Sequence, residues 1–380
     1  MTLRAVVIGA GWAGEGHTNA LRYCGVEVVA ICARQANATQ AVADRLGIPL
    51  ASTDWRQTLE SVKPDIVDLA TPAALRGEVI EVATKLGCHV LSDKPLATTA
   101  GEAKRLYTLV EQAGVKHAYA ATHRYDPLFA WLAELLHNDM IGGLREIEVL
   151  GRFPLVTELT PWFWWDSLAT GGGALNGGLT HILGTLETII GRQVVKVTGE
   201  ARVLRQRAPV VPELHDYRLR RTETPTAVEA AHLEWRACDA DHAFSALLQF
   251  AALVPDAPLV QVYVGINMMT SRVAPNNGWY FYGEQGMLVA EGVTPTAVFR
   301  RDDAAAQGEP LAVPPHLVAA LPKVGDDFQN KWAALAGDFV ADIRGEPHNP
   351  YLTFRDGWRY QEVIDAIRAG HGWYQVPELS

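Results

Sequence analysis

The glycine-rich segment near the N-terminus is the first part of the chain whose residue types and spacing indicate a chemistry. A GxGxxG pattern is formed by Gly9, Gly11 and Gly14, with Trp12 and Ala13 ahead of the third glycine, between a predicted strand and a predicted helix. The first glycine permits a tight turn, the second lets the backbone approach a pyrophosphate, and the third allows the helix to pack closely on the strand. The pattern predicts a dinucleotide site at the helix N-terminus. A glycine-rich turn without a ligand is the alternative.

The end of the second predicted strand bears on which dinucleotide is bound. About twenty residues after the glycines, a site that prefers NAD normally offers an acidic side chain to the ribose 2′-hydroxyl. This chain has Ala33, Arg34 and Gln35 there instead. A carboxylate would repel a 2′-phosphate, whereas the guanidinium of Arg34 can pair with it bidentately. We therefore expect NADP to be favoured over NAD. The alternative is an arginine that is merely exposed at a strand end.

Short apolar segments and amphipathic helical segments alternate through the first third of the chain, which predicts parallel βαβ units. The strand candidates are residues 3–8, 26–32, 66–70, 89–92 and 117–120. Helices are predicted at residues 14–23, 37–46 and 99–113, and a further one at 127–139. We therefore expect residues 1–122 to form an α/β Rossmann domain with a doubly wound parallel sheet.

The second part of the chain, residues 123–380, has a different pattern. Strand candidates follow one another at 145–153, 194–204, 227–237, 243–253, 259–268 and 278–284. Such a series predicts an open, mostly antiparallel sheet. Helices are expected after the glycine triplet 171–173 and at 328–344 and 354–369, on one face of this sheet. The result is an α+β domain for substrate binding and oligomerisation, whose bare sheet face is a candidate interface of a homodimer or homotetramer.

Two segments of this second part are expected to lie outside regular structure. Residues 304–315 are the most loop-like stretch. Residues 238–242 read Cys-Asp-Ala-Asp-His, which could suggest a metal site, but they lie between two strand candidates, so we expect a hairpin turn there. No metal is therefore predicted.

The composition limits the classes of protein that the chain can belong to. Its 380 residues, 48% hydrophobic and 20% charged, suit two globular domains, and its apolar runs are too short to cross a membrane. A predicted strand begins almost at once, which leaves no room for an export signal, so we expect a cytoplasmic protein with reduced, scattered cysteines. The net charge of −10 argues against a nucleic-acid surface. The expected partner is a small molecule.

Four further segments, taken with the glycine-rich loop, resemble the Gfo/Idh/MocA oxidoreductases over essentially the whole chain. They are Thr71-Pro72, Asp93-Lys94-Pro95, the segment 123–127 (HRYDP) and the segment 171–181 (GGGALNGGLTH). In that family a Glu-Lys-Pro motif brings the catalytic lysine next to the nicotinamide. The resemblance implies this role for Lys94, with Asp93 in place of glutamate.

The same resemblance implies where the other segments lie. Thr71 and Pro72 would border the cofactor together with Asp93, whereas His123 and Arg124 would border the substrate. A lysine that is partly desolvated beside a cationic nicotinamide has its ammonium form disfavoured, so Lys94 could exchange a proton with a substrate hydroxyl. The alternative for Lys94 is an exposed lysine at a strand end.

The segment 171–181 departs from the family at one position. The family places an aspartate and a histidine four residues apart, facing the substrate; His181 matches the histidine, but the aspartate position is Gly177. Asn176 could hydrogen-bond a substrate hydroxyl but cannot accept a proton, and Asp166 is the nearest carboxylate upstream. His181 is expected to assist Lys94. A histidine that only packs in the interior is the alternative.

An aromatic run, Trp-Phe-Trp-Trp at 162–165, precedes Asp166. Aromatic faces next to a carboxylate suit a sugar or a cyclic polyol, because the rings stack on C–H groups and the carboxylate binds hydroxyls. Trp165 and Asp166 are therefore candidate substrate residues. The same aromatics could equally fill the core between the domains.

Three functions are compatible with these residues, two of them enzymatic and one from a different class. The first is an NAD(P)-dependent oxidoreductase that transfers hydride between the nicotinamide and a sugar-like or polyol-like alcohol or carbonyl, with Lys94 as acid and base and His181 assisting. The second is a redox-neutral enzyme, such as an epimerase, dehydratase or glycosidase-like enzyme, with a tightly bound cofactor. The third is a dinucleotide-binding regulator without catalysis, which Gly177 favours and the retained Lys94 and His181 disfavour.

Overall fold

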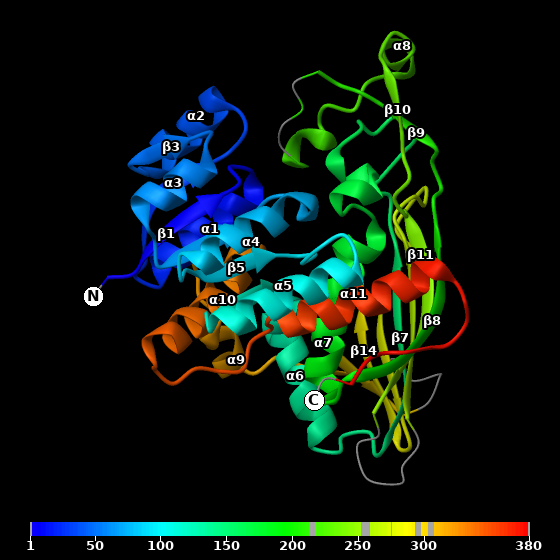
Figure 1. Cartoon of the computed structure of the whole chain (residues 1–380). Coiled ribbons are helices and arrows are strands. Elements are labelled where there is room, and N and C mark those ends of the chain that lie inside the picture. Colours follow the sequence, from blue (N-terminus) through cyan, green and yellow to red (C-terminus); the bar gives the residue numbers. More distant parts are fainter. Residues whose placement is uncertain are drawn as a thin grey trace.

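The computed structural model describes residues 2–212, 214, 217–251, 259–274, 276–292, 298–302 and 308–378. Two domains lie side by side, with the N-terminal domain in blue and cyan and the sheet of the second domain in green and yellow (Figure 1). No helix of these described ranges is long and apolar enough to cross a membrane.

The first domain is built on a six-stranded parallel sheet with the order β3-β2-β1-β4-β5-β6. The strands are β1 (Arg4–Ile8), β2 (Glu27–Cys32), β3 (Leu50–Ser52), β4 (Ile66–Leu69), β5 (His89–Asp93) and β6 (His117–Ala120). The helices are α1 (Trp12–Tyr23), α2 (Ala36–Leu46), α3 (Trp55–Val62), η1 (Ala73–Leu75), α4 (Arg76–Lys85) and α5 (Ala100–Ala113). The strand order reverses between β1 and β4, which is where a doubly wound sheet opens a crevice for its ligand.

Helices cover both faces of this sheet. Buried residues of α3, α4 and α5 pack on one face, and those of α1 and α2 pack on the other. The second face is completed by α10 (Asp327–Arg344), which is orange in Figure 1 and lies among the elements of the first domain. Gly16 of α1 makes this contact possible, because a Cβ atom there would lie 2.1 Å from the indole of Trp332. Helix α10 belongs to the segment 123–380 that was predicted as the second domain, but it packs on the first domain.

The second domain contains a nine-stranded sheet with the order β16-β15-β14-β13-β7-β12-β11-β8-β17. All neighbours are antiparallel except β7 and β12. The strands are β7 (Leu144–Arg152), β8 (Val194–Arg202), β11 (Ala243–Phe250), β12 (Val260–Asn267), β13 (Gly278–Gly283), β14 (Gly286–Glu291), β15 (Val298–Arg301), β16 (Glu309–Leu311) and β17 (Tyr374–Gln375). The expected open, mostly antiparallel sheet is confirmed.

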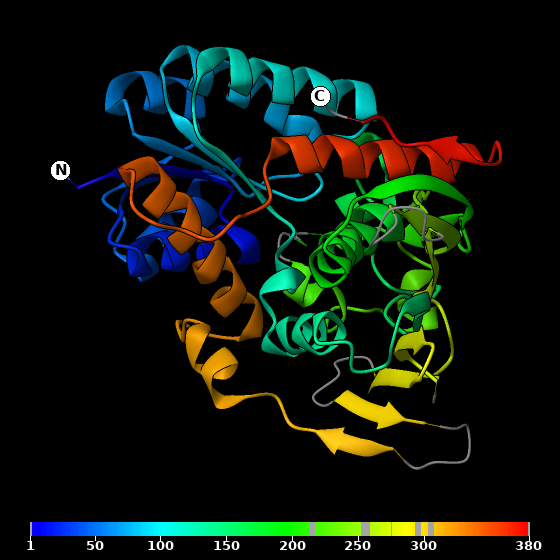
Figure 2. The same cartoon turned by 90° about the horizontal axis from the view of Figure 1, so that it is seen from below.

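Helices α6 (Pro127–His137), α7 (Thr180–Ile190) and α11 (Phe354–Ala369) share a continuous buried core with this sheet. Helix α11 also lies alongside α5 of the first domain (Figure 2). The stacked rings of Tyr107 and Trp358 form part of that contact. The remaining segments are η2 (Thr122–Tyr125), η3 (Trp164–Asp166), η4 (Leu168–Thr170), η5 (Leu175–Leu179, a π-helix), β9 (Arg207–Pro209), η6 (Tyr217–Arg220), α8 (Ala227–Ala230), β10 (Trp235–Ala237) and α9 (Pro315–Ala320).

The prediction of a single strand over residues 227–237 is wrong. Thr226 and Glu229 form a capping box that starts the short helix α8. The strand β10 follows and pairs with β9 in a separate two-stranded sheet. The expected hairpin turn at 238–242 is wrong for the same reason, because this segment connects β10 to β11 and these two strands belong to different sheets. Of the loop-like stretch 304–315, residues 304–307 lie outside the described ranges and 309–311 form β16.

Candidate active site

The glycine-rich turn after β1 has the geometry that a dinucleotide site needs. Gly9 has a φ of +121°, and a Cβ atom there would lie 2.5 Å from the carbonyl oxygen of Ala70. A Cβ atom on Gly14 would lie 1.9 Å from the carbonyl oxygen of Gly9, so both positions require glycine. At Gly11, in contrast, a Cβ atom would meet nothing within 4 Å. The backbone therefore borders open space at the glycine that should approach the pyrophosphate.

The N-terminus of α1 also fits a bound pyrophosphate. Gly11 occupies the N-cap position, and no described side chain caps this helix end. Trp12 and Ala13 follow in the first turn, so their backbone N–H groups have no helical carbonyl to bind. Free N–H groups and the positive end of the helix dipole are what a phosphate binds. The residues present therefore fit the group that the sequence predicts.

The second domain reaches this part of the cofactor site through Arg218 of η6. Its guanidinium lies 3.1 Å from Oε1 of Glu15, the residue that follows Gly14. Arg45 of α2 binds the same carboxylate bidentately, at 2.7 and 3.0 Å. Burial alone would raise the pKa of Glu15, but the two arginines lower it below its usual range. An ion-pair cluster thus joins both domains beside the glycine turn.

At the end of β2, the structure places Arg34 on the surface. The turn at 33–35 contains no carboxylate, and Arg34 forms no ion pair with any residue in the described ranges. Its guanidinium is therefore available to a ligand at the position where an adenosine ribose would lie.

Strands β4 and β5 are parallel neighbours, so the turns that follow them lie side by side. The first turn contains Thr71 and Pro72, and the second contains Asp93, Lys94 and Pro95. The hydroxyl oxygen of Thr71 is buried and has no hydrogen-bond partner among the described residues. Unpartnered buried polar atoms are uncommon, and one at this edge suits contact with a ligand.

Lys94 is partly buried at the end of β5, and its backbone N–H donates to Oδ1 of Asp93 at 2.8 Å. Burial lowers the pKa of the Lys94 ammonium; the carboxylate of Asp93 opposes this effect, and the guanidinium of Arg76 adds to it. A lysine in this state can hold or release a proton closer to neutral pH than an exposed lysine.

The glycine triplet of the second domain abuts both turns. A Cβ atom on Gly171 would lie 2.7 Å from the methyl group of Ala73 and 3.6 Å from Cγ of Pro95. This contact fixes the start of the segment that leads through η5 into α7. His181 in the first turn of α7 is thereby brought to the side of Lys94, whose charge acts on the imidazole.

Two histidines stack at this point. The rings of His123 and His181 are nearly parallel, at 13°, with centroids 4.0 Å apart. Burial, followed by the charges of Lys331 and Lys94, lowers the pKa of His123 to about 3. Burial, His123 and the same lysines hold the pKa of His181 well below its usual range. Both imidazoles are therefore neutral at neutral pH, and Nδ1 of His181 has no hydrogen-bond partner in the described structure.

Lys331 of α10 is a member of this cluster that sequence reasoning missed. Its ammonium lies 2.9 Å from Asp126 and 2.6 Å from Asp327, and it is nearly inaccessible to solvent. Its charge faces the stacked histidines. Nothing near Lys331 in the sequence indicated a role, because Lys331 lies 237 residues downstream of Lys94 (331 − 94) and reaches the site only through the return of α10. Arg124, predicted beside the substrate, lies partly buried next to His123 with its guanidinium 5.9 Å from the ring of Tyr125.

The prediction that Asp166 binds substrate is wrong. Asp166 is completely buried; Oδ1 accepts a hydrogen bond from Arg205 at 2.8 Å, and Oδ2 accepts from Arg220 and from the Phe163 backbone N–H. Burial alone would raise its pKa, but the neighbouring His242 and the two arginines lower it to about 2. Because both oxygens are occupied, Asp166 anchors the segment between β8 and β11.

Asn176 is likewise turned into the interior. Its amide N–H donates to the carbonyl oxygen of Gly172 at 3.1 Å, and its oxygen accepts from Arg368 of α11 at 3.5 Å. The same arginine binds Asp241 at 2.8 Å, and Asp241 in turn accepts from the backbone N–H of Leu175. These contacts hold the start of η5, and they contradict the predicted role of Asn176 in substrate binding.

Trp165 occupies the space beside Gly177. A Cβ atom on Gly177 would lie 3.0 Å from the indole nitrogen of Trp165, which is closer than most real Cβ contacts. A carboxylate at position 177 would therefore require the indole to move. Trp165 itself is partly buried, so it remains a candidate wall of the substrate site.

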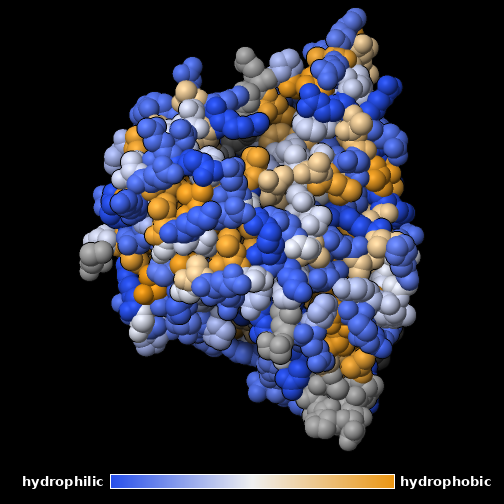
Figure 3. Space-filling view, viewed as in Figure 1, coloured by the Kyte–Doolittle hydropathy of each residue, from blue (hydrophilic) through white to orange (hydrophobic). Residues whose placement is uncertain are grey.

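Hydrophilic residues cover most of the face seen in Figure 3, and the surface is hollowed between the two lobes at the top of this view.

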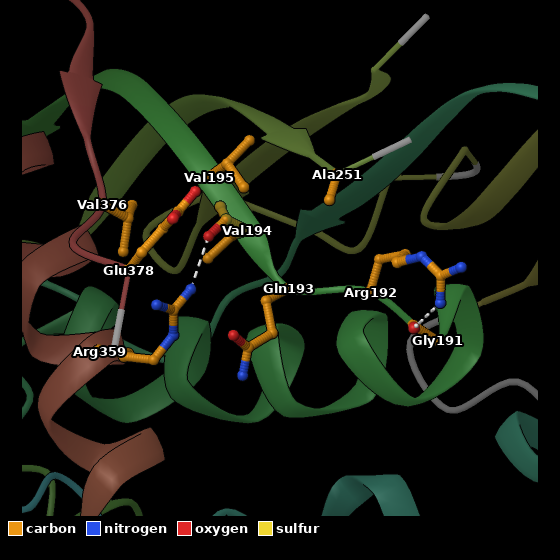
Figure 4. A pocket seen from close by; sticks show the side chains of 9 residues that line it. All are labelled: Gly191, Arg192, Gln193, Val194, Val195, Ala251, Arg359, Val376 and Glu378. Carbon is orange, nitrogen blue, oxygen red and sulfur yellow. Dashed lines mark hydrogen bonds between the residues drawn. The ribbon is translucent and has the colours of Figure 1, made fainter. Parts of the chain in front are cut away.

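A separate cavity of about 420 Å³ lies at the end of α7 remote from His181. It is lined by Gly191, by the start of β8 and by the C-terminal segment, and Figure 4 shows the guanidinium of Arg359 pointing to the carbonyl oxygen of Val194. None of the residues discussed above lines it. The candidate active site at the glycine turn and Lys94 is therefore separate from this cavity.

These features define a two-domain dinucleotide-binding protein with a Rossmann domain and an α+β partner domain. The family model described as the oxidoreductase family with an NAD-binding Rossmann fold matches residues 3–121, and the GFO/IDH/MocA C-terminal domain matches residues 129–289. The chain belongs to the Gfo/Idh/MocA family of oxidoreductases, as its motifs predict.

Among curated proteins, the chain is similar to levoglucosan dehydrogenase of Pseudarthrobacter phenanthrenivorans, with 28% identity over 205 residues. That match covers 50% of this chain and 51% of the relative. It is also similar to D-glucoside 3-dehydrogenase of Escherichia coli, with 31% identity over 145 residues, or 37% of this chain and 41% of the relative. The aligned part thus spans about half the length of these relatives or less.

Solved structures match over the full length. A levoglucosan dehydrogenase in complex with NADH and L-sorbose has a TM-score of 0.80 at 20% identity, covering 99% of both chains. An oxidoreductase domain protein from Kribbella flavida has a TM-score of 0.78 at 23% identity, covering 99% of this chain and 100% of that one. These likenesses establish the shared fold.

Proposed function

We propose that this protein is an NAD(P)-dependent oxidoreductase that transfers hydride between the nicotinamide and a sugar-like or polyol-like alcohol or carbonyl. The observation that carries the proposal is Lys94, a desolvated lysine at the carboxyl end of β5, next to two neutral stacked histidines and the glycine turn. The names of the similar curated proteins, which are sugar and glycoside dehydrogenases, support the substrate class.

Each group of the site has a defined part in this reaction. A bound nicotinamide supplies the acceptor or donor of hydride. In the oxidation direction, the neutral amine of Lys94 takes the proton of the substrate hydroxyl, and in reduction the ammonium returns it. His181, held neutral by burial, offers Nδ1 for a hydrogen bond with a substrate oxygen. Thr71 and Pro72 border the cofactor, and His123, Arg124 and Trp165 border the substrate.

For the cofactor, we propose that NADP is preferred over NAD. The exposed Arg34 at the end of β2 supports this preference, because its guanidinium is free to pair with a 2′-phosphate and no carboxylate stands in the turn. The test is the binding of NADP⁺ and NAD⁺ to the wild type and to Arg34→Asp, measured by titration calorimetry. We expect the variant to bind NADP⁺ at least about tenfold more weakly, with little change for NAD⁺. Tighter binding of NAD⁺ by the wild type would contradict the proposal.

The activity is tested by following nicotinamide absorbance with a panel of anhydrosugars, alkyl glucosides, pentoses and inositols. A substrate-dependent change with at least one class is the expected result. No change with any class, combined with no binding of either dinucleotide, would overturn the proposal and favour a non-catalytic role.

A redox-neutral reaction on a retained cofactor is the second candidate. The contact between Arg218 and Glu15 favours it, because an ion pair across the domains beside the glycine turn would slow cofactor exchange. Cofactor that copurifies with the protein and is not turned over would support this candidate. Full exchange within the dead time of mixing would exclude it.

We further propose a homodimer or homotetramer formed through the open face of the nine-stranded sheet. This face carries half-buried side chains in register across neighbouring strands, including Tyr263, Glu148 and Tyr280. A single copy would leave these aromatic rings against water. Native mass spectrometry tests the assembly, and a monomer at micromolar concentration would contradict it.

A further inference from the structure

Arg76, the first residue of α4, has no part in the function proposed above, yet it lies beneath the site. Its side chain is only about 1% exposed, and it is among the largest fully buried side chains of the described structure. The described carboxylates form no ion pair with it. Burial lowers the pKa of Arg76, and the charges of Asp93 and Asp68 act against this effect without an ion-pair contact. Burying a guanidinium is costly, and hydrogen bonds offset part of that cost.

The guanidinium of Arg76 connects the two turns that face the cofactor. Nε donates to the carbonyl oxygen of Thr71 at 2.9 Å, and Nη2 donates to the same oxygen. Nη1 donates to the carbonyl oxygens of Asp93 and Pro95, and Nη2 lies 3.4 Å from that of Lys94. A single side chain thus binds main-chain carbonyls of the turns after β4 and after β5.

The chemistry of this arrangement requires arginine. A guanidinium presents five N–H donors in a rigid plane, whereas a lysine ammonium at the same place has three donors at one point. Only the planar group can reach carbonyls of both turns at once. Because these acceptors are main-chain atoms of Thr71, Asp93 and Pro95, the contact sets the position of the backbone from which Lys94 projects.

We propose that Arg76 is a positioning residue for the reaction: it joins the Thr71–Pro72 turn to the Lys94 turn as one rigid unit and places a positive charge against the backbone of the Lys94 turn. The inference rests on the proposed function of Lys94 as the proton-exchanging group. The charge disfavours the ammonium form of Lys94, so that neutral amine is available for alcohol oxidation.

Several other ionisable groups lie around Lys94, and Arg76 is the cation that hydrogen-bonds to the backbone of the Lys94 turn. Asp93, on the same turn, opposes Arg76 and raises the pKa of Lys94. His123 and His181, which face Lys94 from η2 and α7, are neutral. Lys331 of α10 faces these histidines and is paired with two aspartates.

Two substitutions separate the two roles of Arg76. Arg76→Lys keeps the charge and loses the planar fork, whereas Arg76→Met loses both. We expect Arg76→Met to lower kcat about 100-fold, as a misplaced reacting group does, and to raise the pH of half-maximal alcohol oxidation by about one. Arg76→Lys should lower kcat about tenfold and leave that pH unchanged. The control is Arg105→Met, which removes a half-exposed arginine of α5 and should change neither quantity.

A second measurement does not depend on turnover. The rate at which Lys94 reacts with acetic anhydride as pH rises, read by mass spectrometry on the cofactor-free protein, reports the titration of its amine. The midpoint should rise in Arg76→Met and stay in Arg76→Lys and Arg105→Met. A shifted midpoint in a protein without activity on any substrate would retain the positioning role and reject the proposed function. An unshifted midpoint or a wild-type kcat in Arg76→Met would overturn the positioning role. If Arg76→Met does not fold, the test is the kcat of Arg76→Lys: a roughly tenfold loss supports the positioning role, and a wild-type value overturns it.

Discussion

Glu187 offers a test of the packing that holds α7, the helix whose first turn carries His181. Its carboxylate accepts a hydrogen bond from the Tyr360 hydroxyl at 2.9 Å and from the Val194 backbone N–H at 3.2 Å. Burial is the main reason that its pKa is raised from 4.5 to about 7; Asp356 adds to the rise, and these hydrogen bonds oppose it. The folded protein therefore holds a proton on Glu187 that the unfolded chain releases.

The size and sign of the effect follow from this difference. Below the unfolded pKa of 4.5 both states are protonated, and between 4.5 and about 7 only the folded state is. The free energy of unfolding therefore falls as pH rises through this window, by about 3 kcal/mol in total, since each tenfold step in protonation corresponds to about 1.4 kcal/mol. Glu187→Gln removes the titrating group and keeps a neutral side chain of the same shape.

The assay is urea unfolding followed by tryptophan fluorescence, at several values from about pH 5 to about pH 8. As pH rises through this range, the free energy of unfolding of Glu187→Gln should increase by about 3 kcal/mol relative to that of the wild type. The control Glu60→Gln removes an exposed carboxylate of α3 and should follow the wild type at every pH. If the free energy of unfolding depends on pH in the same way in the wild type and in Glu187→Gln, the described burial of this carboxylate is refuted.

Two further substitutions test contacts between distant segments. Gly16→Ala places a methyl group 2.1 Å from the Trp332 ring, so the free energy of unfolding should fall by about 1–3 kcal/mol and the melting temperature should fall with it. Trp332→Leu should partly restore the melting temperature of this variant. An unchanged melting temperature in Gly16→Ala would contradict the packing of α10 on α1. Asp166→Asn leaves the guanidinium groups of Arg205 and Arg220 buried without their counter-ion, and urea unfolding should show a loss of about 3–5 kcal/mol. A loss below about 1 kcal/mol would mean that Asp166 is not the anchor described here.

Features set by local sequence could be predicted. The glycine turn was recognisable because the requirements at Gly9 and Gly14 arise within a single strand-turn-helix unit. The strands of the first domain follow from uninterrupted apolar runs, although the three-residue strand β3 is too short to give such a signal. The position of Lys94 followed from the resemblance of its motif, which is also local.

Features set by contacts between distant segments could not be predicted. Asp166 was expected in the substrate site because it follows four aromatic residues. Its partners Arg205 and Arg220 lie in the segment that connects β8 to β11, and the pairing arises only when the chain folds. Lys331 reaches the histidines because α10 returns to the first domain. Arg76 has no flanking pattern that distinguishes a buried arginine at a helix start from an exposed one.

Hydride transfer by Lys94→Ala tests the central claim most directly. Single-turnover oxidation should be measured by stopped flow, with an accepted sugar or polyol and saturating NADP⁺, against the wild type and against Lys85→Ala, which alters an exposed lysine at the end of α4. For the wild type we expect the rate to rise with pH to a plateau whose midpoint lies below 10.5, because burial lowers the pKa of Lys94. Lys94→Ala should lose at least about 100-fold in rate and lose this pH dependence, while Lys85→Ala keeps both. A wild-type rate and pH profile in Lys94→Ala would contradict the assignment.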